Sequence, residues 1–293
     1  MIENSNQMIS AKFSSFLKDL LGDSSGKMAF AGFVLLTIFI LMAIFAPLIA
    51  PYSPTQPSGQ PLLPPNIHHL MGTDNLGYDV FSRFIYGSRM ALTIAFIATL
   101  IAAAVGIPTG LIVGYIGGPL DRVITMIMDS VYTFPGLILA IAIAAVLGPG
   151  IINISLSIAV VYIPTYYRVI RSQVASVKNE LYVESAYSIG AKTSTIIFKY
   201  ILPNVLPSII VVLSMNIADA IMTEAGLSFL GLGITPPTPD WGYDLANGQQ
   251  FIVSNNWWMA FFPGIAIILI VLGFSMFAEG LNEYFNPNIG EKR

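Results

Sequence analysis

The sequence predicts an all-α membrane protein with six transmembrane helices. Of its 293 residues, 55% are apolar and only 10% are charged, whereas a soluble domain carries about 25% charged residues. A chain with so few charges cannot coat a water-facing surface, so most of its helices must face lipid. Six apolar stretches, each close in length to the ~20 residues needed to cross a bilayer, alternate with polar segments. Each of these stretches is predicted to be one membrane span.

The first predicted span covers residues 28–50 and follows a polar N-terminal segment, residues 1–27. This apolar run is longer than the core of a signal peptide, and it ends in LIAPYSP rather than at a small-residue cleavage site. We therefore expect an uncleaved helix. Residues 51–89 then form an external loop, which opens with a Pro-rich run that cannot be helical in lipid.

A five-helix core is predicted over residues 90–284, before a polar tail at residues 285–293. Its spans are expected at residues 90–115, 123–147, 151–167, 201–227 and 257–278. The longest polar interruption between them is residues 168–200. Prolines lie in or near several of these runs, as membrane helices tolerate when neighbours satisfy the freed carbonyl groups.

The distribution of Lys and Arg predicts the orientation of these spans. With the N-terminus inside, eleven of the thirteen basic residues fall on the inner side, and only Arg83 and Arg89 fall outside. Loops on the cytoplasmic side are rich in Lys and Arg. We therefore expect both termini and residues 168–200 to be cytoplasmic in a multi-pass protein of the plasma membrane.

The internal loop 168–200 contains a predicted short helix. Small and apolar residues recur there at helical spacing, namely Val183, Ala186, Tyr187 and Gly190. On a helix they form one narrow stripe, with Glu184 in the first turn, where a carboxylate is favourable. Gly190 permits the turn that ends it. A second short helix is expected over 193–201, capped by hydroxyls. Such a stripe can dock into a groove of a partner protein or lie flat on lipid, and the spacing leaves both open.

The same loop resembles a known family motif. Glu184-Ser185-Ala186, followed by Gly190 and by Ile201-Leu202-Pro203, is similar to the "EAA" loop in the membrane subunits of bacterial and archaeal ABC importers, with Ser185 where Ala is usual. The resemblance implies that the helix couples to a cytoplasmic ATPase. The coupling residues it implies are Val183, Glu184, Ser185, Ala186, Tyr187, Gly190 and Ala191.

Two further stretches narrow the resemblance. HLMGTDNLGYDVFSRFIYGSRMAL (69–92) and EAGLSFLGLGITPPTPDWG (224–242) resemble the second permease subunit of the dipeptide, oligopeptide and nickel importers, although Tyr78 stands where Arg is usual. The resemblance implies a type I permease fold in a prokaryotic inner membrane. It implies as partners a homologous permease, two ATPase subunits and an extracellular or periplasmic binding protein. Peptides are the expected substrate; nickel complexes and oligosaccharides remain open.

Acidic residues inside the predicted spans are candidates for the transport path. Asp219 and Glu224, with Met222 between them, lie in the fifth span. A membrane-embedded acid is costly and usually faces a cavity or a partner, so these residues line the path or bond to neighbouring helices. Their spacing places them about 140° apart on a helix, which argues against a catalytic carboxylate pair. Asp129 is expected to have a structural partner.

Other functions find little support in the residues. The chain has no Cys, and His68 and His69 are its only histidines. An adjacent pair without a carboxylate or thiolate nearby is a poor metal site, so packing is expected. The net charge of −3 argues against nucleic-acid binding. The chain carries no phosphate-cradling Gly-Lys-Ser/Thr motif. We therefore expect no cofactor on this chain, with ATP and magnesium bound by separate ATPase subunits.

Two other functional classes are disfavoured by the sequence. A self-sufficient secondary transporter would be expected to show repeated halves or coupling residues at the midplane, and an intramembrane hydrolase would need a Ser/His or His/Glu constellation; neither is evident. Several external residues are predicted to form structural turns that hold the outer loops together, with contact to a binding protein as the alternative. These are Asp74, Asp79, Asp240, Asp244 and Trp241.

Overall fold

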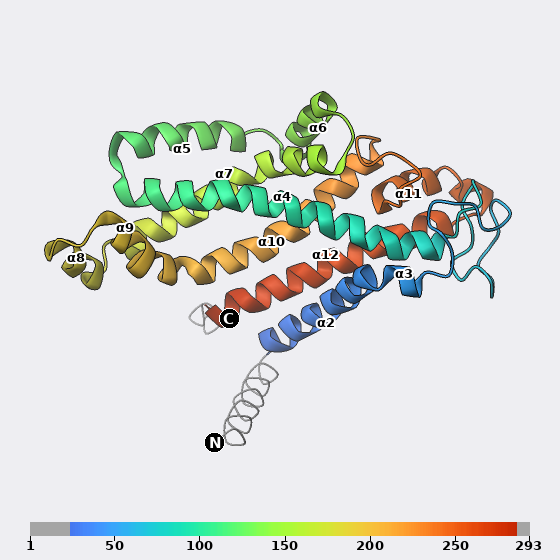
Figure 1. The fold of residues 1–293 in the computed structure, drawn as a ribbon, viewed down its shortest axis with the longest axis horizontal. Helices are drawn as coiled ribbons and strands as arrows, with labels where there is room; N and C mark the ends of the chain where they lie inside the picture. The colour runs from blue at the N-terminus through green and yellow to red at the C-terminus, as the bar shows by residue number, and fades with distance from the viewer. Residues whose placement is uncertain (1–23, 286–293) are drawn as a thin grey trace, which may run out of the picture.

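The computed structural model describes residues 24–285, and over this range the chain is an elongated bundle of helices (Figure 1). The long elements run side by side, with α8 at one end of the bundle and α11 at the other; we refer to these as the α8 end and the α11 end. The elements are α2 (Ser24–Ile44), α3 (Ala46–Ile49), α4 (Val80–Ile116), α5 (Gly118–Tyr132), α6 (Gly136–Leu147), α7 (Ile151–Val177), α8 (Leu181–Ser188), α9 (Thr193–Thr195), the π-helix η1 (Ile196–Ile201), α10 (Leu202–Phe229), α11 (Trp241–Gln249), the 3-10 helix η2 (Ile252–Ser254) and α12 (Trp258–Phe285).

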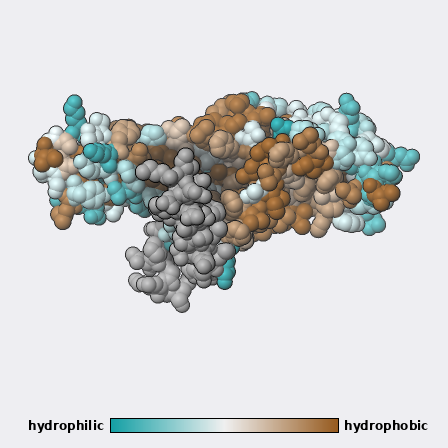
Figure 2. All heavy atoms as spheres, turned by 60° about the horizontal axis from the view of Figure 1, so that its bottom comes forward, coloured by the Kyte–Doolittle hydropathy of each residue, from teal (hydrophilic) through white to brown (hydrophobic). Residues whose placement is uncertain are grey.

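Within residues 24–285, four helical stretches are long and apolar enough to cross a membrane, namely Gly26–Ile44, Val80–Ile116, Thr193–Phe229 and Trp258–Tyr284. A fifth candidate is the bent pair formed by α5 and α6. Figure 2 shows apolar residues gathered over the middle of the visible face and hydrophilic residues at both ends. This is the distribution expected of a bundle that spans a bilayer with its two ends in water. The all-α membrane class is therefore confirmed.

Residues 123–147, predicted as one membrane span, form two helices instead of one. α5 ends at Tyr132, α6 begins at Gly136, and the two axes meet at 87°. Pro135 has no backbone N–H to donate, and its ring disfavours a helical conformation at Phe134. The sequence had placed this proline inside a span, but here it ends the first helix instead of kinking a continuous one.

Two helix boundaries also differ from those predicted. α4 begins at Val80 rather than near residue 90, because the Asp79 carboxylate caps it by accepting a 2.7 Å hydrogen bond from the Ser82 backbone N–H. The expected separate helix over 193–201 is instead the start of one continuous stretch that runs on to Phe229. It follows Lys192 without a side-chain cap, so the predicted hydroxyl cap is also wrong.

The predicted ends of the chain are largely outside the described residues. All but the last four residues of the polar segment 1–27, and all but the first residue of the tail 285–293, lie beyond the range 24–285. α2 covers most of the first predicted span, and α3 continues it after a break at Phe45. Pro47 is accommodated in the first turn of α3, where its missing N–H costs nothing.

α4 and α7 pack closely along a row of glycines. Gly106, Gly110 and Gly114 recur every four residues on the α4 face that meets α7. A Cβ added at Gly106 would lie 2.5 Å from the Tyr166 Cβ atom, and one at Gly110 would lie 2.9 Å from the Tyr167 carbonyl oxygen. Small residues at this spacing let two membrane helices approach until their backbones touch. We call this contact between Gly106, Gly110 and Gly114 of α4 and the facing side of α7 the glycine seam. It encloses part of α7 within the bundle, although the polar residues of α7 lower its hydropathy.

Two apolar cores stabilise the ends of the bundle. The larger one lies toward the α11 end, where α2, α4, α10 and α12 surround the buried Trp241 ring. The smaller one lies toward the α8 end and joins α4, α7, α8, η1 and α10 through residues such as Leu111, Ile170 and Val205. These two cores hold in place the helices that carry the candidate functional residues.

Candidate functional site

α8 is held on the bundle by its inner face. Val183 and Ala186 are buried. Val183 belongs to the same apolar cluster as Ile196 and Ile197 of η1. The predicted stripe is therefore divided: two of its members pack against the chain itself and are not available to a partner. The sequence could not show this division, because the same spacing fits a helix docked on its own chain and one docked on another.

The opposite face of α8 is open. Leu181 is 78% exposed and Tyr187 is 71% exposed, and Ile189, just past the helix, is 83% exposed. Glu184 and Ser185 are also exposed. Large apolar side chains exposed at the end of a membrane bundle are typical of an interaction surface, for a partner protein or for lipid. We call Leu181, Glu184, Ser185, Tyr187 and Ile189 the outer face of α8.

Gly190 ends α8 as predicted. Its backbone adopts φ = +81°, which an L-residue rarely adopts. The Gly190 N–H donates to the Tyr187 carbonyl at 2.9 Å, and the Ala191 N–H donates to the Ala186 carbonyl at 3.1 Å. This paired pattern is the Schellman motif. Gly190 is thus required by the turn itself, whatever partner binds nearby.

Three contacts fix the base of the loop. The Lys178 Nζ donates to the Gly114 carbonyl at 3.2 Å, which ties the end of α7 to the last turn of α4. Arg171 of α7 bonds both carboxylate oxygens of Asp121 in α5, with a 2.6 Å contact from Nη2. These contacts hold α4, α5 and α7 together beside the loop that carries α8.

Asp129 has the structural partner predicted for it. Its carboxylate accepts from Arg168 Nη2 at 2.7 Å, and the same guanidinium stacks 4.0 Å from the centre of the Tyr132 ring. The sequence missed the cleft that this contact borders. One face of α5, with Arg171, lines an open cleft of about 1000 Å³ that is rich in polar groups. The signal was present, because the polar residues of α5 recur at helical spacing.

The three predicted path residues separate into two environments. Asp219 and Met222 lie on one exposed face of α10. Glu224 instead points into the bundle, is only 2% exposed, and bonds to Ser228. The alternative expectation for Glu224 was a bond to a neighbouring helix. Ser228 belongs to the same helix, but its hydroxyl also bonds Asp240 at the start of α11. Asp219 stays accessible to a cavity or a partner.

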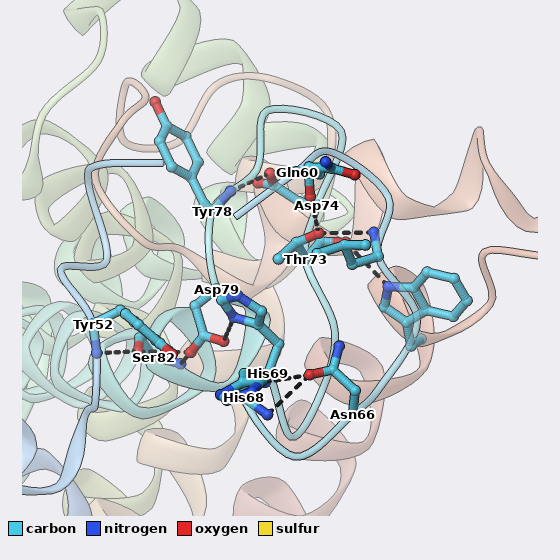
Figure 3. A network of polar contacts seen from close by, with 12 residues as sticks. Tyr52, Gln60, Asn66, His68, His69, Thr73, Asp74, Tyr78, Asp79 and Ser82 are labelled. Carbon is cyan, nitrogen blue, oxygen red and sulfur yellow. Dashed lines mark hydrogen bonds and ion pairs between the residues drawn. The ribbon is translucent and has the colours of Figure 1, made fainter. Parts of the chain in front are cut away.

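The two histidines diverge, as Figure 3 shows. His68 is exposed, whereas His69 is buried, stacks on the Tyr52 ring and bonds Asp79 Oδ1 through Nδ1 at 2.8 Å. The expectation that no carboxylate lies near them is wrong, because Asp79 is ten residues away in sequence but adjacent in space. Asp79 also caps α4, so the packing role predicted for His69 is confirmed. Across residues 24–285, no group of three or more acidic, His or Cys side chains could hold a metal ion.

The structural turns predicted for the outer loops are present at the α11 end. Asp74 Oδ1 accepts from the backbone N–H of Leu76 at 2.8 Å and from that of Tyr78 at 2.9 Å, the second contact being drawn in Figure 3. Burial raises the pKa of Asp74 above its ordinary value. Asp240 caps α11 through the Tyr243 N–H. These carboxylates shape the outer loops by accepting backbone hydrogen bonds.

Arg83 and Trp241 connect the outer loops to α4. Arg83 bonds both oxygens of Asp244 and donates to the carbonyls of Pro54 and Pro237 at 3.0 and 2.9 Å. Trp241 is buried and donates through Nε1 to the Phe84 carbonyl at 2.9 Å. Arg83 therefore joins segments more than 150 residues apart, which sequence spacing alone could not reveal.

Comparison with known proteins identifies the family. Residues 106–291 match the model described as binding-protein-dependent transport system inner membrane component, and residues 25–65 match the N-terminal TM domain of oligopeptide transport permease C. The first match covers more than half of the chain. The chain belongs to this permease family. It is therefore an inner-membrane permease subunit of an ABC importer, and ATP hydrolysis is not its own activity.

Individual relatives agree with the family. The dipeptide transport system permease protein of Alkalihalophilus pseudofirmus is 43% identical over 90% of this chain and 86% of its own length. The glutathione transport system permease protein of Escherichia coli O6:K15:H31 is 40% identical over 89% and 87%. The structure of the MetNI methionine ABC transporter aligns with a TM-score of 0.55 at 16% identity, covering 70% of this permease and 96% of that chain. That likeness supports the fold alone.

Family membership decides between the functions left open by the sequence. The self-sufficient transporter and the intramembrane hydrolase are both excluded, because the relatives are inner-membrane components of binding-protein-dependent systems. The geometry of α8 is consistent with such a component. Its outer face is exposed, and the Lys178–Gly114 hydrogen bond fixes the end of α7 that leads into it.

Proposed function

We propose that this permease forms half of a transmembrane path for dipeptides and related short peptides, and that the outer face of α8 couples it to a cytoplasmic ATPase. The observation that carries this proposal is the division of α8 into a packed inner face and an exposed outer face. A second permease, two ATPase subunits and an external binding protein would complete the importer. ATP and magnesium would bind only to the ATPase subunits.

The arrangement of basic residues supports the orientation. Seven of the nine Lys and Arg residues in 24–285 lie toward the α8 end, and the two toward the α11 end are Arg83 and Arg89. The side of a membrane protein that is richer in Lys and Arg is cytoplasmic. The α8 end is therefore assigned to the cytoplasm and the α11 end to the outside, which puts the start of α2 and the end of α12 on the cytoplasmic side.

Six spans follow in this proposal from α2, α4, the bent pair α5–α6, α7, α10 and α12. α7 is the least apolar of the long helices, but its buried side chains face α4 along the glycine seam. A span enclosed by protein does not need a lipid-facing surface all round. The bend between α5 and α6 leaves the polar face of α5 beside the cleft near Arg171.

Asp219 and Met222 are assigned to the transport path or to the surface shared with the second permease. Both lie on the exposed face of α10, and a carboxylate that faced lipid there would cost roughly 3 kcal/mol. Glu224 is left out of this assignment because it is enclosed by the chain itself. The peptide substrate is inferred from the relatives, since four of them are named for dipeptide or di/tripeptide transport.

A steric test can separate docking from folding at α8. Ser185→Trp places a large ring on the outer face without disturbing the buried Val183 or Ala186. We expect correct insertion and an intact permease pair, but loss of the ATPase subunits on purification. Gly190→Trp would be ambiguous, because its positive φ makes any L-residue strained. Ser254→Trp, at an exposed position of the α11 end, is the matched control.

Two measurements decide the result. Co-purification reports ATPase docking, and substrate-stimulated ATP hydrolysis in reconstituted vesicles reports coupling. If Ser185→Trp keeps its ATPase subunits and transports peptide like the Ser254→Trp control, α8 is not the docking element. Orientation is tested separately by labelling Thr55→Cys and Ser194→Cys, both exposed positions in a chain without cysteine. A membrane-impermeant thiol reagent should label Thr55→Cys in intact cells and leave Ser194→Cys unlabelled. Labelling of Ser194→Cys instead would show that the proposed orientation is wrong.

A further inference from the structure

Glu224, Ser228 and Asp240 form a buried polar contact that no transport role explains. They join the last turns of α10 to the cap of α11. Ser228 Oγ lies 2.9 Å from Glu224 Oε1 and 2.8 Å from Asp240 Oδ2. Glu224 and Asp240 are 2% and 1% exposed, and their carboxyl groups also lie within reach of each other. Two acids thus meet around one hydroxyl in the protein interior.

The chain closes tightly around this contact. A Cβ added at Gly233 would come within 2.6 Å of the Ser228 Cα atom, and one at Gly242 within 2.8 Å of the Ser228 Cβ atom. The backbone at Gly233 and at Gly242 therefore lies in direct contact with Ser228, and only a residue without a side chain fits at either position. Little room is left for water to solvate a second negative charge.

Counting protons shows that the contact is one proton short. Ser228 has a single hydroxyl proton, and ionised carboxylates only accept. Ser228 therefore cannot give a full hydrogen bond to both Glu224 and Asp240. Asp240 Oδ1 accepts from the Tyr243 N–H, which adds no donor at the shared hydroxyl. A second proton, carried by one of the two carboxyl groups, completes the network.

No neighbouring cation replaces that proton. Within residues 24–285, neither Glu224 nor Asp240 forms an ion pair, and Arg83, the basic side chain of this region, pairs with Asp244. Asp74 adds a further acid to the surroundings of Arg83 and Asp244. α12 packs against α10 and α11 but carries no charged residue before Glu279. The local field thus opposes a second carboxylate charge.

We propose that Glu224 and Asp240 share one proton through Ser228, forming a buried proton-binding site that fastens α11 to α10. With the proton present, both short oxygen contacts are hydrogen bonds and the pair carries a single negative charge. When the proton leaves, two carboxylates face each other across one hydroxyl, and the contact between α10 and α11 weakens. The inference does not depend on which substrate the permease carries.

The test uses the full permease complex and neutral side-chain replacements. Glu224→Gln and Asp240→Asn each supply an N–H donor in place of the shared proton. Infrared difference spectra of the wild type at neutral pH should contain the C=O stretch of a protonated carboxylic acid. Each variant should lose this band. Glu279→Gln, at an exposed position of α12, is the matched control and should retain it.

Thermal stability gives an independent readout. The apparent melting temperature of the wild type should fall by several degrees from neutral pH to about pH 10, together with loss of the acid band, whereas both variants should show a flatter profile. If a variant fails to assemble, the parallel loss of band and stability in the wild type still tests the proposal.

Three results would overturn the proposed proton site. The first is a wild type without a protonated-acid band at neutral pH. The second is a band that survives in both variants. The third is a stability that follows the concentration of sodium or calcium rather than pH, because a bound cation would then occupy the place of the proton.

Discussion

Replacing Arg83 with Met is expected to destabilise the α11 end strongly. The Arg83 side chain is 4% exposed, and its guanidinium donates to both oxygens of Asp244, with the shortest contact at 2.6 Å, and to two proline carbonyls. Removing one partner of a buried ion pair costs about 3–5 kcal/mol. Met retains much of the apolar stem, so the loss comes from the charge and the hydrogen bonds rather than from an empty space.

The magnitude can be checked against an exposed ion pair in the same chain. Arg168 and Asp129 form a 2.7 Å contact of similar geometry, but their side chains are 42% and 46% exposed. Exposed pairs contribute about 0–1 kcal/mol, so Arg168→Met should have little effect. For Arg83→Met we expect the apparent melting temperature of the purified complex to fall by about 10 °C, at roughly 2–4 °C per kcal/mol.

A double-mutant cycle isolates the pair. Arg83→Met with Asp244→Leu removes both charges, and such replacement of a buried pair is often neutral. The double variant should therefore recover part of the loss, with a coupling of about 2 kcal/mol. The reasoning is refuted if Arg83→Met melts like Arg168→Met, or if the double variant loses the sum of the two single losses.

Three other predictions concern separate features. Gly110→Leu should prevent assembly of α4 on α7, because its Cβ alone would lie 2.9 Å from the Tyr167 carbonyl; Gly264→Ala, where the nearest atom is 3.6 Å away, is the tolerated control, and comparable yields of folded protein would contradict the seam. Asp219→Asn should assemble normally but alter transport kinetics, measured as peptide uptake; unchanged uptake would make its role structural. Burial raises the pKa of Asp244 to about 6, above its ordinary value, so the folded chain holds this proton more tightly than the unfolded chain. The contribution of Asp244 to stability should therefore grow as the pH falls from about 6 to about 4, and Asp244→Asn should remove that slope; an identical melting profile in the variant would exclude it.

The division of roles at α8 illustrates what the sequence could and could not predict about the site. Glu184 in the first turn and Gly190 at the end of the helix were predicted correctly, because capping and positive φ are local properties of the backbone. The orientation of Val183 and Ala186 was not, because it depends on η1 and α7. A stripe at helical spacing specifies a face but not the surface that covers it.

The outer loops show the same limit. Turn residues such as Asp74 and Asp240 were recognisable, because short polar side chains accept hydrogen bonds from the next few backbone N–H groups. The pairing of Arg83 with Asp244 and the meeting of Glu224 with Asp240 involve segments that only the folded chain brings together.

By itself, the sequence determined the membrane class, the helical fold, the permease family and the position of the loop helix. These follow from hydropathy, charge and local motifs, whose free energies depend mainly on each residue and its near neighbours. The tertiary structure alone decided the glycine seam between α4 and α7, the packing of Val183 against η1, and the meeting of Glu224 with Asp240. Each of these depends on which part of the chain lies opposite, because a lipid-facing surface and a protein-facing surface can be equally apolar and differ only in the shape that packs against them.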